Sequence, residues 1–305
     1  LKHNSKVITA ETFFLGYTTA IMGNMVDTFT LIYAFLLTIV ICIVCQKNKW
    51  HTLAFAGMIT TYVLWLFHRQ DFWIPFLFLL APFALFTFYA LRIQIRPLAA
   101  SAMILANSLI FFLLGYALFE AERWHHTGLF SFLCALLHFV LALRKTDSKQ
   151  LRLTFLSQGI LFLTLTIPIQ FNSYMITMLW ALEFLILTLA GIRSAIIWIK
   201  VGAVVLGIAT AWKTFVWDTQ FLTAFSFAHF FASIRLFTYL VVIFSLYASA
   251  YLLSRNKKFL FPSEITLASI YTWIASILFF VLISVETKHI WVSLGWMLLA
   301  FALLF

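Results

Sequence analysis

Long apolar stretches, separated by short polar turns, follow one another along almost the whole chain. Residues 31–44 and 274–283 are apolar at nearly every position, without the alternation that a membrane barrel strand shows. A helix that crosses a bilayer needs about 20 mostly apolar residues, and its backbone amides are bonded within the segment. The pattern therefore predicts an all-α, polytopic transmembrane helical protein with about twelve spans, in a range of about 11 to 13.

The apolar stretches give the predicted spans directly, with ends placed to within a few residues. In chain order they are residues 8–25, 28–45, 52–67, 73–91, 98–118, 128–143, 154–169, 174–192, 195–212, 236–253, 263–285 and 290–305. Residues 1–305 are predicted to form a single transmembrane helical domain. We expect it to be part of a longer chain, since it begins at Leu1 and ends inside an apolar run.

Residues 213–235 do not fit this pattern of spans. The segment holds Trp217, Asp218 and His229 among many phenylalanines. It is predicted as an outer-side interfacial or re-entrant segment, and a thirteenth crossing is the alternative. The distribution of basic residues favours the first interpretation.

If residues 213–235 do not cross, 15 of the 20 Lys and Arg residues fall on one side of the membrane. These are Lys2, Lys6, Lys47, Lys49, Arg92, Arg96, Arg144, Lys145, Lys149, Arg152, Arg193, Lys200, Arg255, Lys257 and Lys258. A crossing would move the last three to the opposite side. Positive charge marks the cytoplasmic side, so the N-terminal end of this segment is predicted to be cytoplasmic.

Composition supports a membrane setting and excludes one class of partner. Hydrophobic residues make up 64% of the chain and charged residues 10%, whereas soluble domains carry about 25% charge. The net charge of +10 would indicate nucleic acid on a soluble protein. Here the basic residues cluster in turns, where they act as topology signals, so no nucleic-acid partner is expected. Membrane lipids and other membrane protein subunits are the expected partners.

Four stretches carry a set of short motifs. Residues 162–193 combine an apolar segment ending in Ile-Pro, a polar turn, Trp-x-x-Glu and a closing Gly-x-Arg; the others are TAWKTFVWD (210–218), SIRLFTYL (233–240) and ALLHFVLAL (135–143). Together they resemble a family of predicted bacterial membrane proteins, domain-of-unknown-function family 2339. In that family a turn of the type Asn-Pro-Arg-Phe opens a helix. Ser233 and Ile234 replace Asn and Pro here, so this turn is expected to be built differently.

The resemblance implies a multi-pass protein of the bacterial cytoplasmic (inner) membrane, in chains usually longer than this one. It implies no established reaction and no cofactor.

Glu183 is the most informative single residue, because it lies near the middle of a predicted span. An ionised group at that depth costs about 2.5–3.5 kcal/mol on insertion scales. Two interpretations stay open: a proton or cation site, or an interhelical hydrogen bond that fixes packing. Trp180 lies one turn earlier and is predicted to share its face.

Two other groups of polar residues are candidate sites. Lys213, Asp218 and Arg235 are candidate outer-side contacts for an anion or a lipid head group. A structural Lys213–Asp218 pair is the favoured alternative, and for Arg235 the alternative is snorkelling to the interface. His138 lies within a span and is expected to be a neutral, hydrogen-bonded histidine.

Metal sites and cofactors are not expected. Cys42 and Cys45 have no further ligands nearby in the sequence, so no zinc site is predicted. His125 and His126, next to Glu120 and Glu122, are predicted to be a solvated loop, although a weak divalent-cation site is an alternative. Nucleotide-binding, zinc-protease and hydrolase motifs do not occur in the sequence.

Three functions remain open, and the sequence favours a protein that is not an enzyme. The first is a structural or assembly component of a bacterial envelope membrane complex. The second is a transporter or flippase for a lipid-linked or amphipathic substrate, with Glu183 as the coupling site. The third is an enzyme acting on lipid-linked glycan or acyl groups at the outer face, through His125, His126, Glu122 and Asp218.

Overall fold

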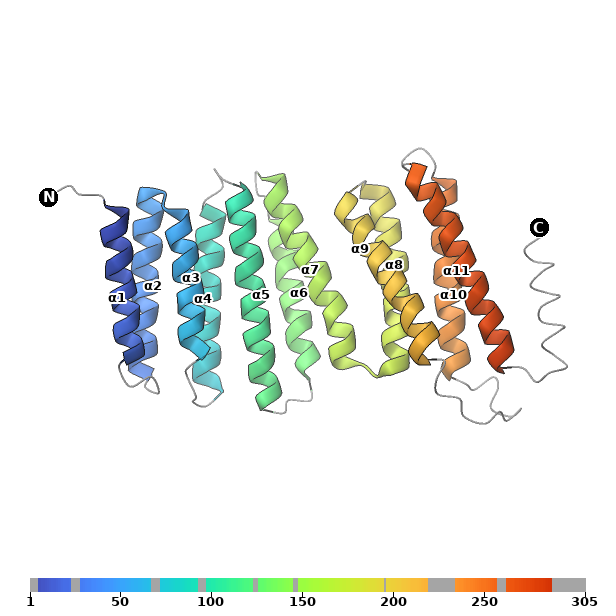
Figure 1. The fold of residues 1–305 in the computed structure, drawn as a ribbon, viewed down its shortest axis with the longest axis horizontal. Helices are drawn as coiled ribbons and strands as arrows, with labels where there is room; N and C mark the ends of the chain where they lie inside the picture. Colours follow the sequence, from blue (N-terminus) through green and yellow to red (C-terminus); the bar gives the residue numbers. More distant parts are fainter. Residues whose placement is uncertain are drawn as a thin grey trace. The chain divides into compact units, whose positions relative to one another are not determined.

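A computed structural model describes residues 5–22, 28–66, 72–92, 97–122, 126–144, 148–194, 196–218, 234–256 and 262–286. The regular elements in these ranges are helices, and none of the described residues forms a strand. The chain divides into two compact units, residues 1–163 and residues 164–305. Figure 1 shows the helices of each unit.

The described helices follow one another with short connections, except between residues 218 and 234. They are α1 (Lys6–Met22), α2 (Thr28–Asn48), α3 (His51–Leu66), α4 (Trp73–Arg92), α5 (Pro97–Ala121), α6 (Thr127–Leu143), α7 (Lys149–Gln170), α8 (Ser173–Ser194), α9 (Ile197–Lys213), α10 (Ile234–Arg255) and α11 (Pro262–Glu286). A short π-helical turn, η1 (Thr214–Asp218), extends α9. Proline stands at the first position of α5 and of α11, where its missing amide proton costs no hydrogen bond.

Each of the first eleven predicted spans coincides with one of these helices, and the all-α prediction is confirmed for the described part of the chain. The predicted span 290–305 lies outside the described residues. Eight of the described helices are long and apolar enough to cross a membrane: α2, α4, α5, α7, α8, α9 with η1, α10 and α11. The helices α3 and α6 are apolar but shorter, at 16 and 17 residues.

In the first unit, phenylalanine rings and interhelical hydrogen bonds join neighbouring helices. Phe130 of α6 stacks with Phe112 of α5 at 6.0 Å between ring centroids, and Phe112 lies 4.9 Å from Phe162 of α7. Asn107 of α5 donates to the Phe83 carbonyl of α4 at 2.9 Å and accepts from the Tyr62 hydroxyl of α3 at 2.7 Å. These buried contacts fix the helices side by side.

In the second unit, α8 packs against both α9 and α10, and α10 packs against α11. The centre of this packing is Phe184 of α8, whose ring is 1% exposed. Its edge meets Tyr271 of α11 at 5.2 Å between ring centroids. On its other side lies Gly207 of α9, where a Cβ atom would stand 2.7 Å from Phe184 Cε2. The glycine therefore lets α8 and α9 approach closely.

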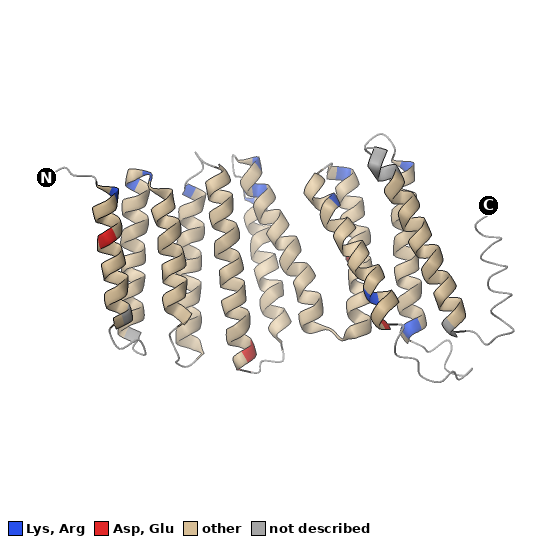
Figure 2. Ribbon diagram, viewed as in Figure 1, with Lys and Arg blue, Asp and Glu red and all other residues tan. Residues whose placement is uncertain are grey.

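Most of the described basic residues of each unit lie at one end of that unit (Figure 2). In the first unit the described Lys and Arg residues all lie at that end: Lys6, Lys47, Lys49, Arg92, Arg144, Lys149 and Arg152. The opposite end carries Glu120 and Glu122. In the second unit Arg193, Lys200 and Arg255 share one end, and Lys213 and Arg235 lie at the other. Successive antiparallel helices bring these distant turns together.

Candidate functional site

Glu183 lies at the middle of α8, about 15 Å along the helix from Ser173. Its side chain is buried, with the residue 8% exposed. The Thr164 hydroxyl of α7 donates to Glu183 Oε1 at 2.6 Å, and the Trp180 indole donates to the Thr164 carbonyl at 3.4 Å. Trp180 and Glu183 therefore share a face of α8, as predicted, and both contact the same residue of α7.

The second oxygen of this carboxyl group has no partner among the described residues. Within that part of the chain, Glu183 Oε2 is buried without a hydrogen bond, and so are the hydroxyls of Ser245 and Ser249 on α10. Ser245 lies about 17 Å along α10 from its start, a depth similar to that of Glu183 on the neighbouring α8. Buried polar groups in proteins are usually paired, so these atoms are exceptions to the bonding of the rest of the described core.

Lys213 and Asp218 form a buried ion pair at the far end of α9. The Lys213 Nζ to Asp218 Oδ1 distance is 2.9 Å, and the two side chains are 8% and 0% exposed. Lys213 Nζ also donates to the Ser173 carbonyl at 2.8 Å and to Thr177 Oγ1 at 2.7 Å. The Thr177 hydroxyl in turn donates to Asp218 Oδ2 at 2.7 Å. The favoured structural pair is thus present, and it joins the end of α9 to the start of α8.

The π-helical turn explains how two residues five apart come together. In an α-helix such residues point about 140° apart around the axis. In a π-helix the hydrogen bonds join residues i and i+5. The η1 turn therefore brings Asp218 back over Lys213. Sequence reasoning gave the pairing without this geometry and without Ser173 and Thr177, because their positions depend on how α8 packs beside α9.

Arg235 lies at the start of α10 and is partly buried. Nearby, the Tyr239 hydroxyl of α10 donates to the Thr214 carbonyl of η1 at 3.2 Å. The start of α10 therefore lies at the same end of the unit as η1 and the start of α8. Residues 219–233, most of the segment 213–235 that was predicted to be interfacial or re-entrant, lie outside the described residues.

His138 of α6 is 1% exposed and is bonded through both ring nitrogens. Nδ1 lies 2.7 Å from the Cys134 carbonyl of its own helix, and Nε2 lies 2.8 Å from Ser108 Oγ of α5. A carbonyl only accepts, so Nδ1 carries the proton and, in the neutral ring, the serine hydroxyl donates to Nε2. The expected neutral, hydrogen-bonded histidine fits this arrangement.

The remaining candidates lie apart from these groups. Glu122, just after α5, and His126, just before α6, are exposed, and His125 lies outside the described residues. Within the ranges that the structure describes, no group of three or more His, Cys, Asp or Glu residues is placed to hold a metal ion. Asp218, a candidate for the enzymatic interpretation, is engaged by Lys213 and Thr177.

Comparisons of the chain with family models, with curated proteins and with solved structures found no match. The resemblance to domain-of-unknown-function family 2339 therefore stays a prediction from the quoted motifs.

Proposed function

We propose that this protein is a multi-pass integral protein of the bacterial cytoplasmic membrane, with about twelve spans and the N-terminal end of this segment in the cytoplasm. The length and apolar character of eight described helices support a membrane location. The gathering of most described Lys and Arg residues at one end of each unit supports the orientation, because positive charge is retained on the cytoplasmic side.

Within that membrane we propose a structural or assembly role beside partner membrane subunits. The buried Lys213–Asp218 pair carries this proposal, because its hydrogen bonds tie α8 and α9 together at one end. His138 and Asn107 are likewise bonded across helices, and interhelical hydrogen bonds of this kind hold transmembrane helices together.

The assembly role is tested by measuring the protein mass of the particle that the tagged full chain forms in mild detergent. Size-exclusion chromatography with light scattering and quantitative mass spectrometry should find a second membrane chain at fixed stoichiometry, from both an N-terminal and a C-terminal tag. A particle accounted for entirely by copies of this chain contradicts the assembly role.

The alternative is a transporter or flippase for an amphipathic substrate, and the unpaired Glu183 Oε2 favours it. In this alternative Glu183 exchanges a proton or a substrate contact at the middle of α8. The probe is a phosphatidylglycerol that carries a fluorescent nitrobenzoxadiazole group and is incorporated in proteoliposomes. Dithionite added outside quenches the fluorescence of the probe molecules that it can reach. If the protein transports the lipid, dithionite should quench more fluorescence than the outer leaflet contains. Glu183→Gln should abolish this additional quenching while the protein stays monodisperse. The structural role predicts the same partial quenching as in protein-free vesicles.

A further inference from the structure

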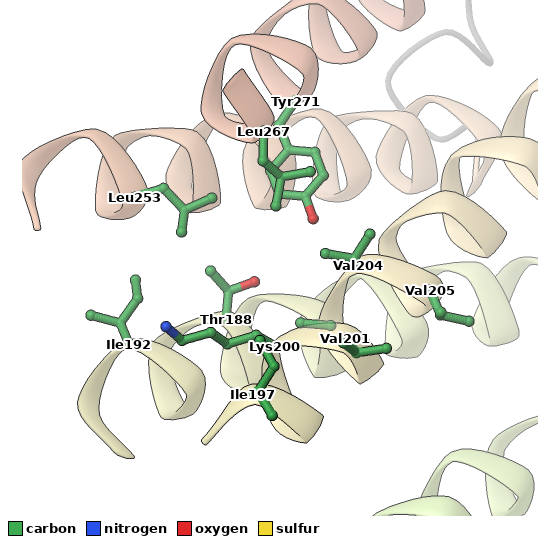
Figure 3. A pocket seen from close by; sticks show the side chains of 11 residues that line it. Thr188, Ile192, Ile197, Lys200, Val201, Val204, Val205, Leu253, Leu267 and Tyr271 are labelled. Carbon is green, nitrogen blue, oxygen red and sulfur yellow. The ribbon is translucent and has the colours of Figure 1, made fainter. Parts of the chain in front are cut away.

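A partly open cavity of about 310 Å³ lies between α8, α9, α10 and α11 of the second unit (Figure 3). Its lining comes from four helices: Thr188 and Ile192 of α8, residues 197, 200, 201 and 203–205 of α9, Leu253 of α10, and Leu267 and Tyr271 of α11. Most of these side chains are aliphatic. The wall is therefore suited to hydrocarbon, in a size range at the lower end of ligand pockets.

The cavity sits at the basic end of the unit. Lys200 is three residues from the start of α9, so it lies about 5 Å in from that helix end. Leu253 is near the end of α10, two residues before the exposed Arg255. Lys200 and Leu253 thus lie near the helix ends, and Val204 and Val205 of α9 lie farther from them.

Besides Thr188, whose hydroxyl donates to the Phe184 carbonyl of its own helix, two polar side chains lie in the apolar wall. The Lys200 side chain extends along the cavity beside Thr188 and Ile192 (Figure 3). Its stem occupies the space above Gly191 of α8, where a Cβ atom would stand 2.9 Å from Lys200 Cγ. The glycine gives room for the lysine at this place.

Tyr271 supplies the second polar group. It is 2% exposed, its ring is held edge-on by Phe184, and its hydroxyl points into the cavity (Figure 3). Among the described residues, no side chain or carbonyl forms a hydrogen bond with that hydroxyl. The hydroxyl faces the cavity, so it can donate to an oxygen atom of a molecule bound there.

We propose that this cavity binds an anionic phospholipid of the surrounding membrane, with the phosphate at Lys200, an ester or phosphate oxygen at the Tyr271 hydroxyl and part of an acyl chain along the α9 wall. The bilayer around the helices is the source of the lipid. A zwitterionic lipid has the same phosphate but carries a positive group beside it, which lies close to Lys200 and weakens the attraction, so anionic lipids are preferred. The cavity holds a portion of the lipid, and the rest of the molecule stays in the leaflet.

This inference goes beyond the assembly role and does not depend on partner subunits. The test uses the purified full chain in detergent, with native mass spectrometry of competition between phosphatidylglycerol and phosphatidylcholine of the same acyl chains. The unmodified protein should retain phosphatidylglycerol preferentially. Lys200→Gln should weaken that retention about fivefold, the contribution expected of one lysine near a membrane surface.

Arg193→Gln is the matched control, because Arg193 is an exposed cation at the same end of the unit that does not line the cavity. It should leave the preference unchanged, and Lys200→Arg should restore most of it. Val201→Trp should block the chain site and lower retention with all charges kept. Equal retention of the two lipids by the unmodified protein overturns the proposal, whether or not the variants fold. Equal losses in Lys200→Gln and Arg193→Gln also overturn it, since they would reflect surface charge alone.

Discussion

At the scale of single residues, the Lys213–Asp218 pair shows how a charge is kept inside an apolar bundle. Lys213 has three ammonium protons, and the Ser173 carbonyl, Thr177 Oγ1 and Asp218 Oδ1 accept within 2.9 Å of its nitrogen. Removing one partner of such a pair leaves an uncompensated buried charge, whereas removing both leaves none.

This asymmetry gives a test by substitution. Lys213→Met should lower the free energy of unfolding by about 3–5 kcal/mol, because Asp218 is left buried and charged. The double variant Lys213→Met/Asp218→Leu should recover most of that loss. The measurement is equilibrium unfolding in sodium dodecyl sulfate, followed by circular dichroism of the purified protein.

The exposed Arg193 provides the control, since Arg193→Met removes a cation without breaking a buried pair. It should change stability by no more than about 1 kcal/mol. A double variant that is no more stable than Lys213→Met would show that the pair is not the source of the loss.

At the scale of helices, the apolar pattern predicted the elements well and their side-chain contacts poorly. The helices α5 and α11 begin at Pro97 and Pro262, as the sequence indicates, because proline is favoured in a first turn. The apolar pattern did not predict the hydrogen bond from Thr164 to Glu183 or the cavity beside Lys200. Each depends on the rotation of one helix against another, and helices that are apolar on all sides give no periodic signal for that rotation.

Close packing between α8 and α9 gives the second prediction. Gly207→Ala places a Cβ atom 2.7 Å from Phe184 Cε2, so the Phe184 ring must move. Tyr271 already packs against that ring. Overpacking of this kind should cost about 1–3 kcal/mol of unfolding free energy. The measurement is the same unfolding titration.

Gly202 lies on the same helix and serves as the control, because no atom of the described residues lies within 4 Å of its added Cβ position. Gly202→Ala should leave stability unchanged or raise it, since alanine is the better helix former. Equal behaviour of the two alanine variants would contradict the close contact at Phe184.

At the scale of the whole molecule, the proposed membrane topology requires that hydrocarbon surrounds the helices and that the basic turns gather on one side. Eight described helices meet the length and apolarity that a span requires. The sequence predicted this architecture because both signals, apolar length and loop charge, are local along the chain. The arrangement of partner chains is not local, so the assembly role depends on measurement.

Labelling of single cysteines in intact cells tests the topology most directly. The three native cysteines are first replaced by alanine, and one cysteine is then placed at Glu122, Arg144 or Arg255, which are exposed positions at helix ends. A membrane-impermeant maleimide should label Glu122→Cys in intact spheroplasts, and Arg144→Cys and Arg255→Cys only after the membrane is opened. Labelling of Arg144→Cys and Arg255→Cys from opposite faces would contradict the account.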